Sequence, residues 1–129
     1  MSYTVIPAGD HAWEERPSPG SDEARLAADV TAEAGLSNSR ARIWRLPPGT
    51  RGRRHAEHTQ EEAFVVFAGT LTMLLGDPPE RFDLAPLSVV AVKPGTGLQL
   101  RNEGEAEAVV FAYGAPPVVG ADYLDDVEL

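Results

Sequence analysis

The stretch that decides the fold reads Gly49-Thr-Arg-Gly-Arg-Arg-His55-Ala-Glu57-His58-Thr-Gln-Glu61-Glu62. The β-rich segment Phe64-Val65-Val66-Phe67 follows it, and a turn glycine stands at position 69. Imidazole and carboxylate groups at the start of a strand, ahead of a hairpin turn, are typical of a metal site on the wall of a small barrel. The stretch contains two of the three histidines of the chain, so we expect any imidazole site to be built here.

Short apolar runs separated by glycine and proline turns continue on both sides of this stretch. Upstream, Ala41–Leu46 alternates in polarity and Pro47-Pro48-Gly49 ends it as a turn. Downstream, the predicted strands are Ala63–Ala68, Thr70–Leu75, Arg81–Leu84, Ser88–Val92, Leu98–Arg101 and Ala108–Tyr113. About eight or nine short strands, spaced by roughly 8–12 residues, predict an all-β sandwich or barrel.

Length and composition predict one domain and exclude several function classes. The chain has 129 residues, of which 43% are hydrophobic, enough for a single core. Its formal net charge of −9 works against a nucleic-acid partner, because binding a phosphate backbone requires a surplus of Lys and Arg. No segment reaches the ~20 apolar residues of a membrane helix and the start lacks a basic flank, so we expect a cytoplasmic protein without a membrane partner. Since the chain has no cysteine, any metal must be held by nitrogen and oxygen.

Three segments lie outside the expected core barrel, which spans about residues 41–114. Residues 1–23 are polar and proline-bearing, and they predict an arm that covers the core or contacts a partner. Residues 24–34 fit a helix by their alanines and a strand by period-two apolar positions, and we predict a strand. Residues 116–129 end in an acidic run, and we expect this tail to lie outside the core.

The spacing around His55 resembles the first motif of the cupin superfamily. That motif has Gly, five residues, His-x-His, three or four residues, Glu, six residues and Gly, and Gly49, His55, Glu62 and Gly69 match it. The resemblance covers about residues 46–114. It implies a double-stranded β-helix, or jelly-roll barrel, and a single cupin domain over residues 1–129.

A second segment resembles the other cupin motif but lacks its histidine. Pro94, Gly95 and Asn102 stand where that motif has Pro, Gly and Asn, whereas Leu98 occupies the position of the histidine. The resemblance implies a site of three His and one Glu that holds iron, manganese, zinc or a similar ion. An apolar residue at position 98 removes one of these donors.

The first motif also departs from the family pattern, because Glu57 occupies its second histidine position. His58 lies one step further on, and a shift of three residues from His55 places it on the opposite face of a regular strand. What remains is a reduced set of His55, Glu57 and Glu62, which suits Mg²⁺, Mn²⁺ or Zn²⁺. The alternative is a site without cofactor, in which His55 and Glu62 bond to each other or to water.

Apolar residues at matching strand positions predict the lining of a ligand cavity. The predicted ligand-binding residues are Phe64, Val66, Met73, Leu98, Leu100, Phe111 and Tyr113. The alternative is that these side chains fill the barrel as an ordinary core. Near the mouth, Arg51 and Arg53 share a face with His55, and with Arg54 they either hold a small anion or pair with surface acids.

Three function classes follow from these patterns. The first is a small-molecule-binding barrel without catalysis, which Leu98 and Glu57 favour. The second is a metal-dependent enzyme, of the oxygenase, isomerase or lyase class by family resemblance. The third is a structural barrel that acts as a homodimer, with the pocket incidental. A homodimer is expected in all three classes, and the sequence assigns no catalytic residue.

Overall fold

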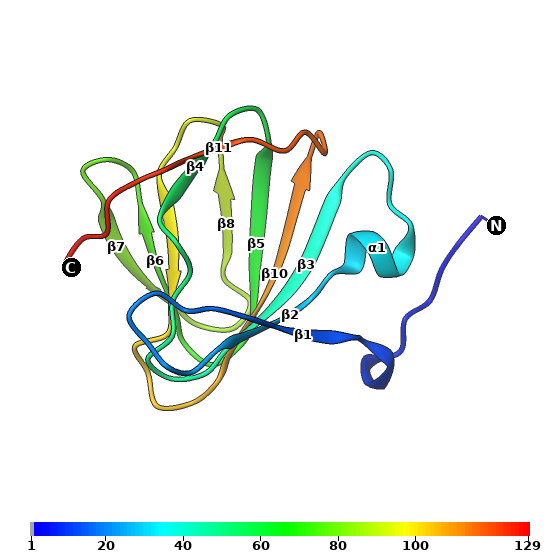
Figure 1. Ribbon diagram of the computed structural model, residues 1–129, viewed down its shortest axis with the longest axis horizontal. Helices are drawn as coiled ribbons and strands as arrows, with labels where there is room; N and C mark the ends of the chain where they lie inside the picture. The colour runs from blue at the N-terminus through cyan, green and yellow to red at the C-terminus, as the bar shows by residue number, and fades with distance from the viewer. Residues whose placement is uncertain (1) are drawn as a thin grey trace.

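The computed structural model describes residues 2–129, which form two antiparallel sheets packed face to face (Figure 1). The sheets have the strand orders β1-β2-β3-β10-β5-β8 and β11-β4-β9-β6-β7. The strands are β1 (Trp13–Arg16), β2 (Arg25–Ala28), β3 (Arg40–Leu46), β4 (His55–Glu57), β5 (Glu61–Ala68), β6 (Leu71–Leu75), β7 (Glu80–Leu84), β8 (Val89–Val92), β9 (Leu98–Arg101), β10 (Ala108–Ala115) and β11 (Ala121–Tyr123). The predicted all-β jelly-roll architecture is confirmed.

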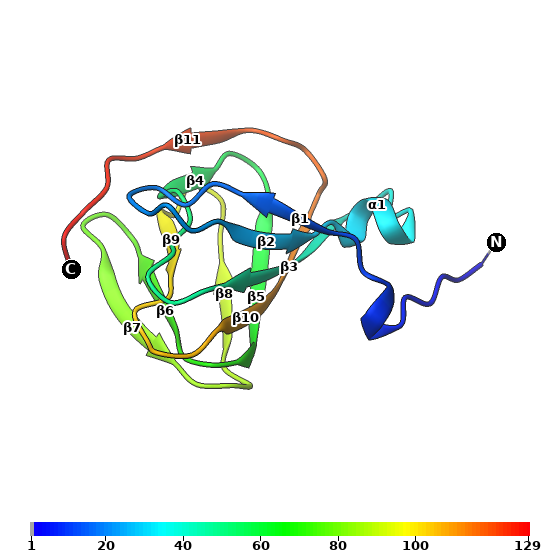
Figure 2. The ribbon, with the colours of Figure 1, turned by 60° about the horizontal axis from the view of Figure 1, so that its bottom comes forward.

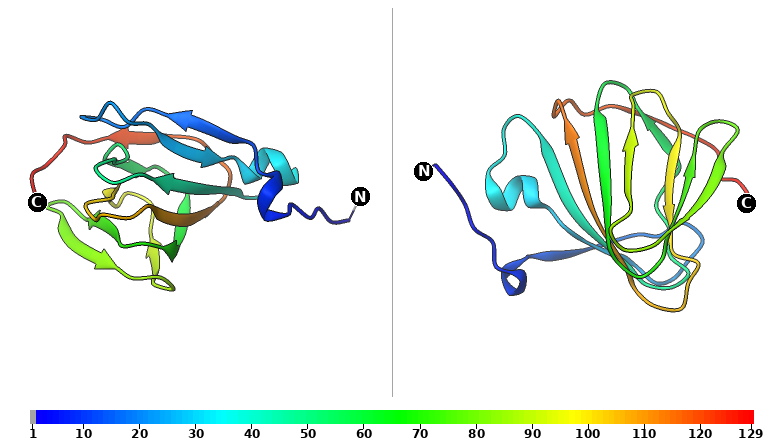
Figure 3. Two further views of the ribbon diagram at one scale, coloured as in Figure 1. Left: turned by 90° about the horizontal axis from the view of Figure 1, so that it is seen from below. Right: turned by 180° about the vertical axis from the view of Figure 1, so that it is seen from behind.

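The core forms where alternate side chains of the two sheets meet. In the larger sheet, Val110 of β10 pairs with Trp44 of β3 and with Val66 of β5, and these positions face inward. The buried core cluster consists of Leu46, Phe64, Val66, Leu71, Met73, Val92, Leu98, Leu100, Ala108 and Val110. The two sheets curve toward each other around it (Figure 3). Strands β3, β5 and β10 converge at one end of the molecule and splay apart at the other (Figure 1).

Both glycines that open and close the first motif lie at turns with a positive φ. Gly49 has φ of 83°, and Gly69, at the end of β5, has φ of 71°. A Cβ at position 69 would also collide with the backbone carbonyl oxygen of Glu107. These positions require glycine for backbone reasons, which is why the glycine spacing predicts the fold even where ligand residues differ.

Residues 24–34 contain both a strand and a helix. The strand prediction is confirmed for Arg25–Ala28 and wrong for helix α1 (Val30–Ala34). The side chain of Asp29 accepts a hydrogen bond from the backbone N–H of Ala32 (3.4 Å), and Gly35 ends the helix in the left-handed conformation. Asp29 therefore interrupts the strand by acting as a helix N-cap. A short 3-10 helix, η1 (Ala8–Asp10), precedes β1, and no helix within residues 2–129 is long and apolar enough to cross a membrane.

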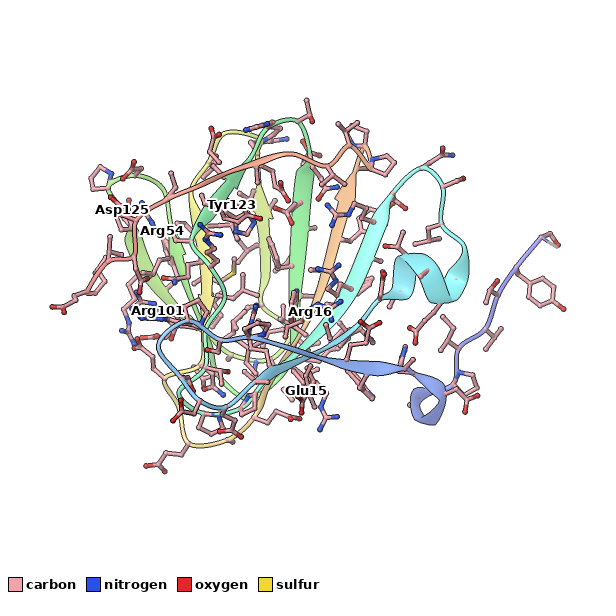
Figure 4. The ribbon with its side chains drawn as sticks, in the orientation of Figure 1. Glu15, Arg16, Arg54, Arg101, Tyr123 and Asp125 are labelled. Carbon is pink, nitrogen blue, oxygen red and sulfur yellow. The ribbon has the colours of Figure 1, made fainter. Side chains whose placement is uncertain are left out.

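The two flanking segments extend the sheets. Strand β1 of the N-terminal arm pairs with β2 at the edge of the larger sheet, and strand β11 of the tail pairs with β4 (Figure 2). Part of the tail therefore belongs to the barrel wall, although we expected residues 116–129 to lie outside the core. The guanidinium of Arg54 donates to the carbonyl oxygen of Asp125 (3.0 Å), beside which it lies in Figure 4. Arg101 donates likewise to the carbonyl of Val127.

Candidate functional site

A pocket of about 320 Å³ lies between the sheets. Gly114 of β10 pairs with Arg40 on one side and Glu62 on the other, and Ala112 pairs with Arg42 of β3. Ala112 carries only a methyl group and leaves room beside it, whereas the buried side chain of Gln60 packs against Gly114. Strands β3 and β5 begin and β10 ends at the splayed end of the sheet (Figure 1), so Arg40, Glu62 and Gly114 lie at that end.

The structure brings His55, Glu57 and Glu62 together on the pocket wall. One ligand atom from each residue lies within 4.8 Å of the others. His55 and Glu57 are two residues apart in β4 and therefore share a face, while Glu62 comes from the start of β5. The sequence expectation that these three residues can share one face agrees with this geometry.

The hydrogen bonding of His55 leaves one ring nitrogen with a lone pair. Its Nδ1 lies 2.9 Å from the carbonyl oxygen of Arg53. A carbonyl oxygen can only accept, so Nδ1 carries the hydrogen and Nε2 of the neutral ring keeps its lone pair. A backbone carbonyl commonly orients a metal-binding imidazole in this way.

Glu62 is the most unusual polar group in the pocket. Its Oε1 is buried and has no hydrogen-bond partner among the described residues. Burial, and after it the neighbouring negative charge of Glu57, raise the pKa of Glu62 from 4.5 to about 7, against a smaller opposing effect of Arg40. A hydrogen bond between His55 and Glu62, the alternative considered from sequence, is not among the hydrogen bonds formed within residues 2–129.

The three donors fit a divalent cation. They supply one imidazole nitrogen and carboxylate oxygens, which Mn²⁺ and Zn²⁺ accept as ligands. A cation would also give the buried Oε1 of Glu62 the partner that it lacks and would neutralise the repulsion from Glu57. The donor set of this chain therefore fits such an ion.

An apolar wall faces these donors. Leu98 of β9 pairs directly with His55 of β4 and is only 1% exposed. Of the seven residues predicted to line a cavity, Phe64, Leu98 and Leu100 do so with buried side chains. Tyr113 also borders the pocket, but it has the same strand parity as Phe111 and is 46% exposed. Val66 and Met73 instead lie in the packed core.

The predicted inward placement of Phe111 is wrong. Phe111 lies across from Val65 on the outer face of the sheet, and its ring packs edge to face against Phe67 (6.3 Å between centroids). The pocket is bordered by Ala112, the next residue along the strand. The error is one of strand parity, since neighbouring residues in a strand point to opposite faces.

The family model described as Cupin domain matches residues 42–113, more than half of the chain. The chain is a cupin. The resemblance inferred from the two motifs is thus confirmed, and this cupin keeps His55 and Glu62 of the motif while carrying Glu57 and Leu98 at its two other ligand positions.

Solved structures of low sequence identity share the fold of this cupin. The polyketide cyclase RemF from Streptomyces resistomycificus has a TM-score of 0.80 and 14% identity, over 97% of this chain and 87% of that one. A sugar phosphate isomerase of the cupin superfamily from Silicibacter pomeroyi has a TM-score of 0.77 and 21% identity, over 95% and 83%. A predicted oxalate decarboxylase from Thermotoga maritima has a TM-score of 0.75 and 14% identity, over 88% and 99%. No curated protein is a significant sequence match.

The other two histidines of this cupin have partners away from the donor group. Nε2 of His58 lies 2.9 Å from Asp122 on β11, so the shifted histidine does not join His55, as strand parity predicts. Nδ1 of His11 lies 2.9 Å from Glu33 at helix α1. Neither residue lines the pocket.

Sequence reasoning missed most of the basic side chains around the pocket. Of the predicted arginine cluster, only Arg53 lines it; Arg51 pairs with Asp126 and Arg54 with Asp77. Arg25, Arg40 and Arg42 line the pocket as well, from strands β2 and β3. The alternation in Ala41–Leu46 puts positions 42 and 44 on one face, and this was the available signal for Arg42.

Proposed function

We propose that this cupin binds a small organic molecule in the pocket, anchored by a divalent cation that His55, Glu57 and Glu62 hold. The observation that carries the proposal is the buried, unpartnered Oε1 of Glu62 within a group of three potential ligands. When bound, such a cation supplies Lewis-acid polarisation of a ligand oxygen. The three similar folds are named for chemistry on small molecules, and they support the same ligand class.

Different residues of the pocket contribute to cation binding and to ligand binding. The carbonyl of Arg53 fixes the ring of His55 so that Nε2 is available. Leu98, Phe64 and Leu100 form the apolar part of the wall, which excludes water and contacts the carbon skeleton of a ligand. The volume of about 320 Å³ is at the lower end of the ~300–1,000 Å³ of ligand pockets, so the ligand is a small metabolite rather than a polymer.

Calorimetric titration of chelator-treated protein with Mn²⁺ and with Zn²⁺ tests this proposal. We expect one site per chain, with Zn²⁺ binding more tightly than Mn²⁺. His55→Ala and Glu62→Gln are each expected to weaken binding by at least about tenfold, or about 1.4 kcal/mol. Glu61→Gln is the matched control, because Glu61 adjoins Glu62 but pairs with Lys93 (2.6 Å) on the exposed side.

The same titration separates the alternatives. Binding that Glu61→Gln weakens as much as Glu62→Gln would show that the cation sits on the surface and not in the pocket. No binding at millimolar metal would favour the metal-free binding barrel, for which Leu98 opposite His55 is the supporting observation.

The predicted homodimer and cytoplasmic location stay part of the proposal. The outer face of the larger sheet carries exposed apolar side chains, including Phe67 (52% exposed) and Val89 (66%). Such a face is compatible with a contact between two copies. Light scattering on wild type and Phe67→Asp tests the dimer.

A further inference from the structure

The basic side chains of this protein fall into two groups. Among residues 2–129, seven pair with a carboxylate within 4.0 Å: Arg16, Arg45, Arg51, Arg54, Arg81, Lys93 and Arg101. The chain has eleven Lys and Arg in total, and the remaining four form no such pair within the described residues. These four are Arg25, Arg40, Arg42 and Arg53, and all of them line the pocket.

This distribution is opposite to what the composition favours. The chain has 20 acidic residues, nearly two for each basic one, so carboxylate partners are abundant. The lining nevertheless contains four arginines against two carboxylates, Glu57 and Glu62. The pocket is therefore locally positive within a protein whose formal net charge is −9.

Two of these arginines are held in fixed positions beside the same ring. The guanidinium carbons of Arg25 and Arg42 lie 4.4 and 5.3 Å from the centroid of the Trp44 ring. Nε and Nη2 of Arg25 donate to the carbonyl oxygen of Pro17, at 3.2 and 2.8 Å. Nη1 of Arg25 takes no part in these bonds. It lies close to Gly52, since a Cβ added to that glycine would be 3.2 Å from it.

Arg42 forms no comparable hydrogen bond to a backbone carbonyl within residues 2–129. Its Nε is buried and has no hydrogen-bond partner among the described residues. Burial and mutual repulsion with Arg42 lower the pKa of Arg25 to about 10, so Arg25 remains positive at neutral pH. Asp29 and Glu14 attract Arg42 from beyond 4.0 Å, but neither Arg25 nor Arg42 has a carboxylate in direct contact. Two adjacent, partly buried cations without a directly paired carboxylate are costly, and a bound anion would reduce that cost.

A third arginine approaches from the other wall. Arg53 lies two residues before β4 of the smaller sheet, and its guanidinium carbon lies 3.8 Å from the ring centroid of Tyr123. The cations thus flank the pocket from both sheets, rather than forming one exposed basic face.

We infer that the pocket selects a small organic acid whose carboxylate or phosphate group is held by the arginines, chiefly Arg25 and Arg42. Guanidinium groups bind both kinds of anion through paired N–H donors. Any contact of the acid with the group His55, Glu57 and Glu62 rests on the cation proposed there under the function above. The anion-binding part does not require the cation.

Calorimetry on chelator-treated protein, with three probes, tests the inference. The probes are succinate, inorganic phosphate and succinamide, the neutral analogue of succinate. Binding of succinate or phosphate but not of succinamide is expected, and the stronger of the two anions identifies the group that the arginines prefer. Arg42→Met should weaken anion binding at least about tenfold.

Arg45→Met is the matched control. Arg45 lies on the same strand but on the outer face, paired with Glu107 (3.1 Å), so its removal changes net charge equally without touching the pocket. Arg45→Met should bind within about twofold of wild type. Equal losses in both variants, equal binding of succinamide, or no binding of either anion by wild type would overturn the inference.

Two further variants keep the result interpretable. Arg40→Gln replaces Arg42→Met if the latter does not fold, as judged by circular dichroism, and it should also weaken anion binding. Glu62→Gln should weaken metal binding at least about tenfold while it binds the anion at least as tightly as wild type, because a negative charge has left the pocket. Failure of the cation proposal and failure of the anion inference are therefore observed separately.

Discussion

Leu98→His is expected to raise the affinity of this cupin for Mn²⁺ and Zn²⁺ by roughly 100-fold, or about 3 kcal/mol. Leu98 is 1% exposed, lines the pocket and pairs directly with His55 across β9 and β4. A histidine at this position adds a second imidazole nitrogen to a donor group that has only one. Titration of the chelator-treated variant measures the gain.

The same variant should be less stable without metal. A buried imidazole without a partner costs about 1–3 kcal/mol, so the melting temperature in chelator should fall and then recover when the metal is added. Leu100→His is the matched control, because Leu100 lines the same pocket from the same strand but pairs with Met73. If both variants gain equally, or neither gains, position 98 does not face the donor group as a ligand would.

Glu62→Gln is expected to stabilise the metal-free protein by about 2 kcal/mol at pH 8. Folding raises the pKa of Glu62 to about 7, chiefly through burial, so ionising this side chain opposes folding. The full difference from 4.5 corresponds to about 3 kcal/mol, and partial exposure to solvent reduces it. Gln keeps the shape of the side chain and removes the charge, which should raise the melting temperature by about 8 °C.

The sign of the pH dependence follows from the raised pKa. The folded state holds the proton more tightly, so the penalty is absent below pH 4.5 and complete above about pH 7. The melting temperatures of wild type and Glu62→Gln should therefore coincide at pH 4.5 and diverge up to pH 8. Glu61→Gln, at the exposed neighbouring position, should follow wild type throughout. A constant gap at every pH would mean that the charge of Glu62 is not the cause.

Metal should reverse this order of stability. Saturating Zn²⁺ stabilises only the protein that binds it, so wild type should approach or exceed Glu62→Gln when the metal is present. This reversal distinguishes a residue kept for binding from one that merely destabilises the fold.

Most strands were predictable because their patterns are local. Leu98–Arg101 has the predicted bounds, and the predicted Ala41–Leu46 differs from β3 by one residue. The prediction failed at Val30–Ala34, where the cap formed by Asp29 outweighs a period-two pattern that a helix also accommodates. It failed at Phe111 because one step of strand parity decides between core and surface.

The donor group was predictable to the same extent as the strands that carry it. His55 and Glu57 are two residues apart in one strand, and Glu62 is the second residue of the next, so their convergence needs only local geometry. The gathering of arginines around the pocket was not predictable, although alternation indicated the face of Arg42. Arg25, Arg42 and Arg53 come from different strands or loops, and their neighbours in space are distant in sequence.

By itself the sequence determined that this protein is an all-β cupin, and that an imidazole and two carboxylates can share a face. Glycine spacing and period-two alternation encode these features, because each acts over a few residues. Only the tertiary structure decided which arginines stay unpaired and that all four turn toward one pocket. Charge pairing depends on which side chains are in contact across strands and sheets, and local sequence patterns do not specify those long-range contacts.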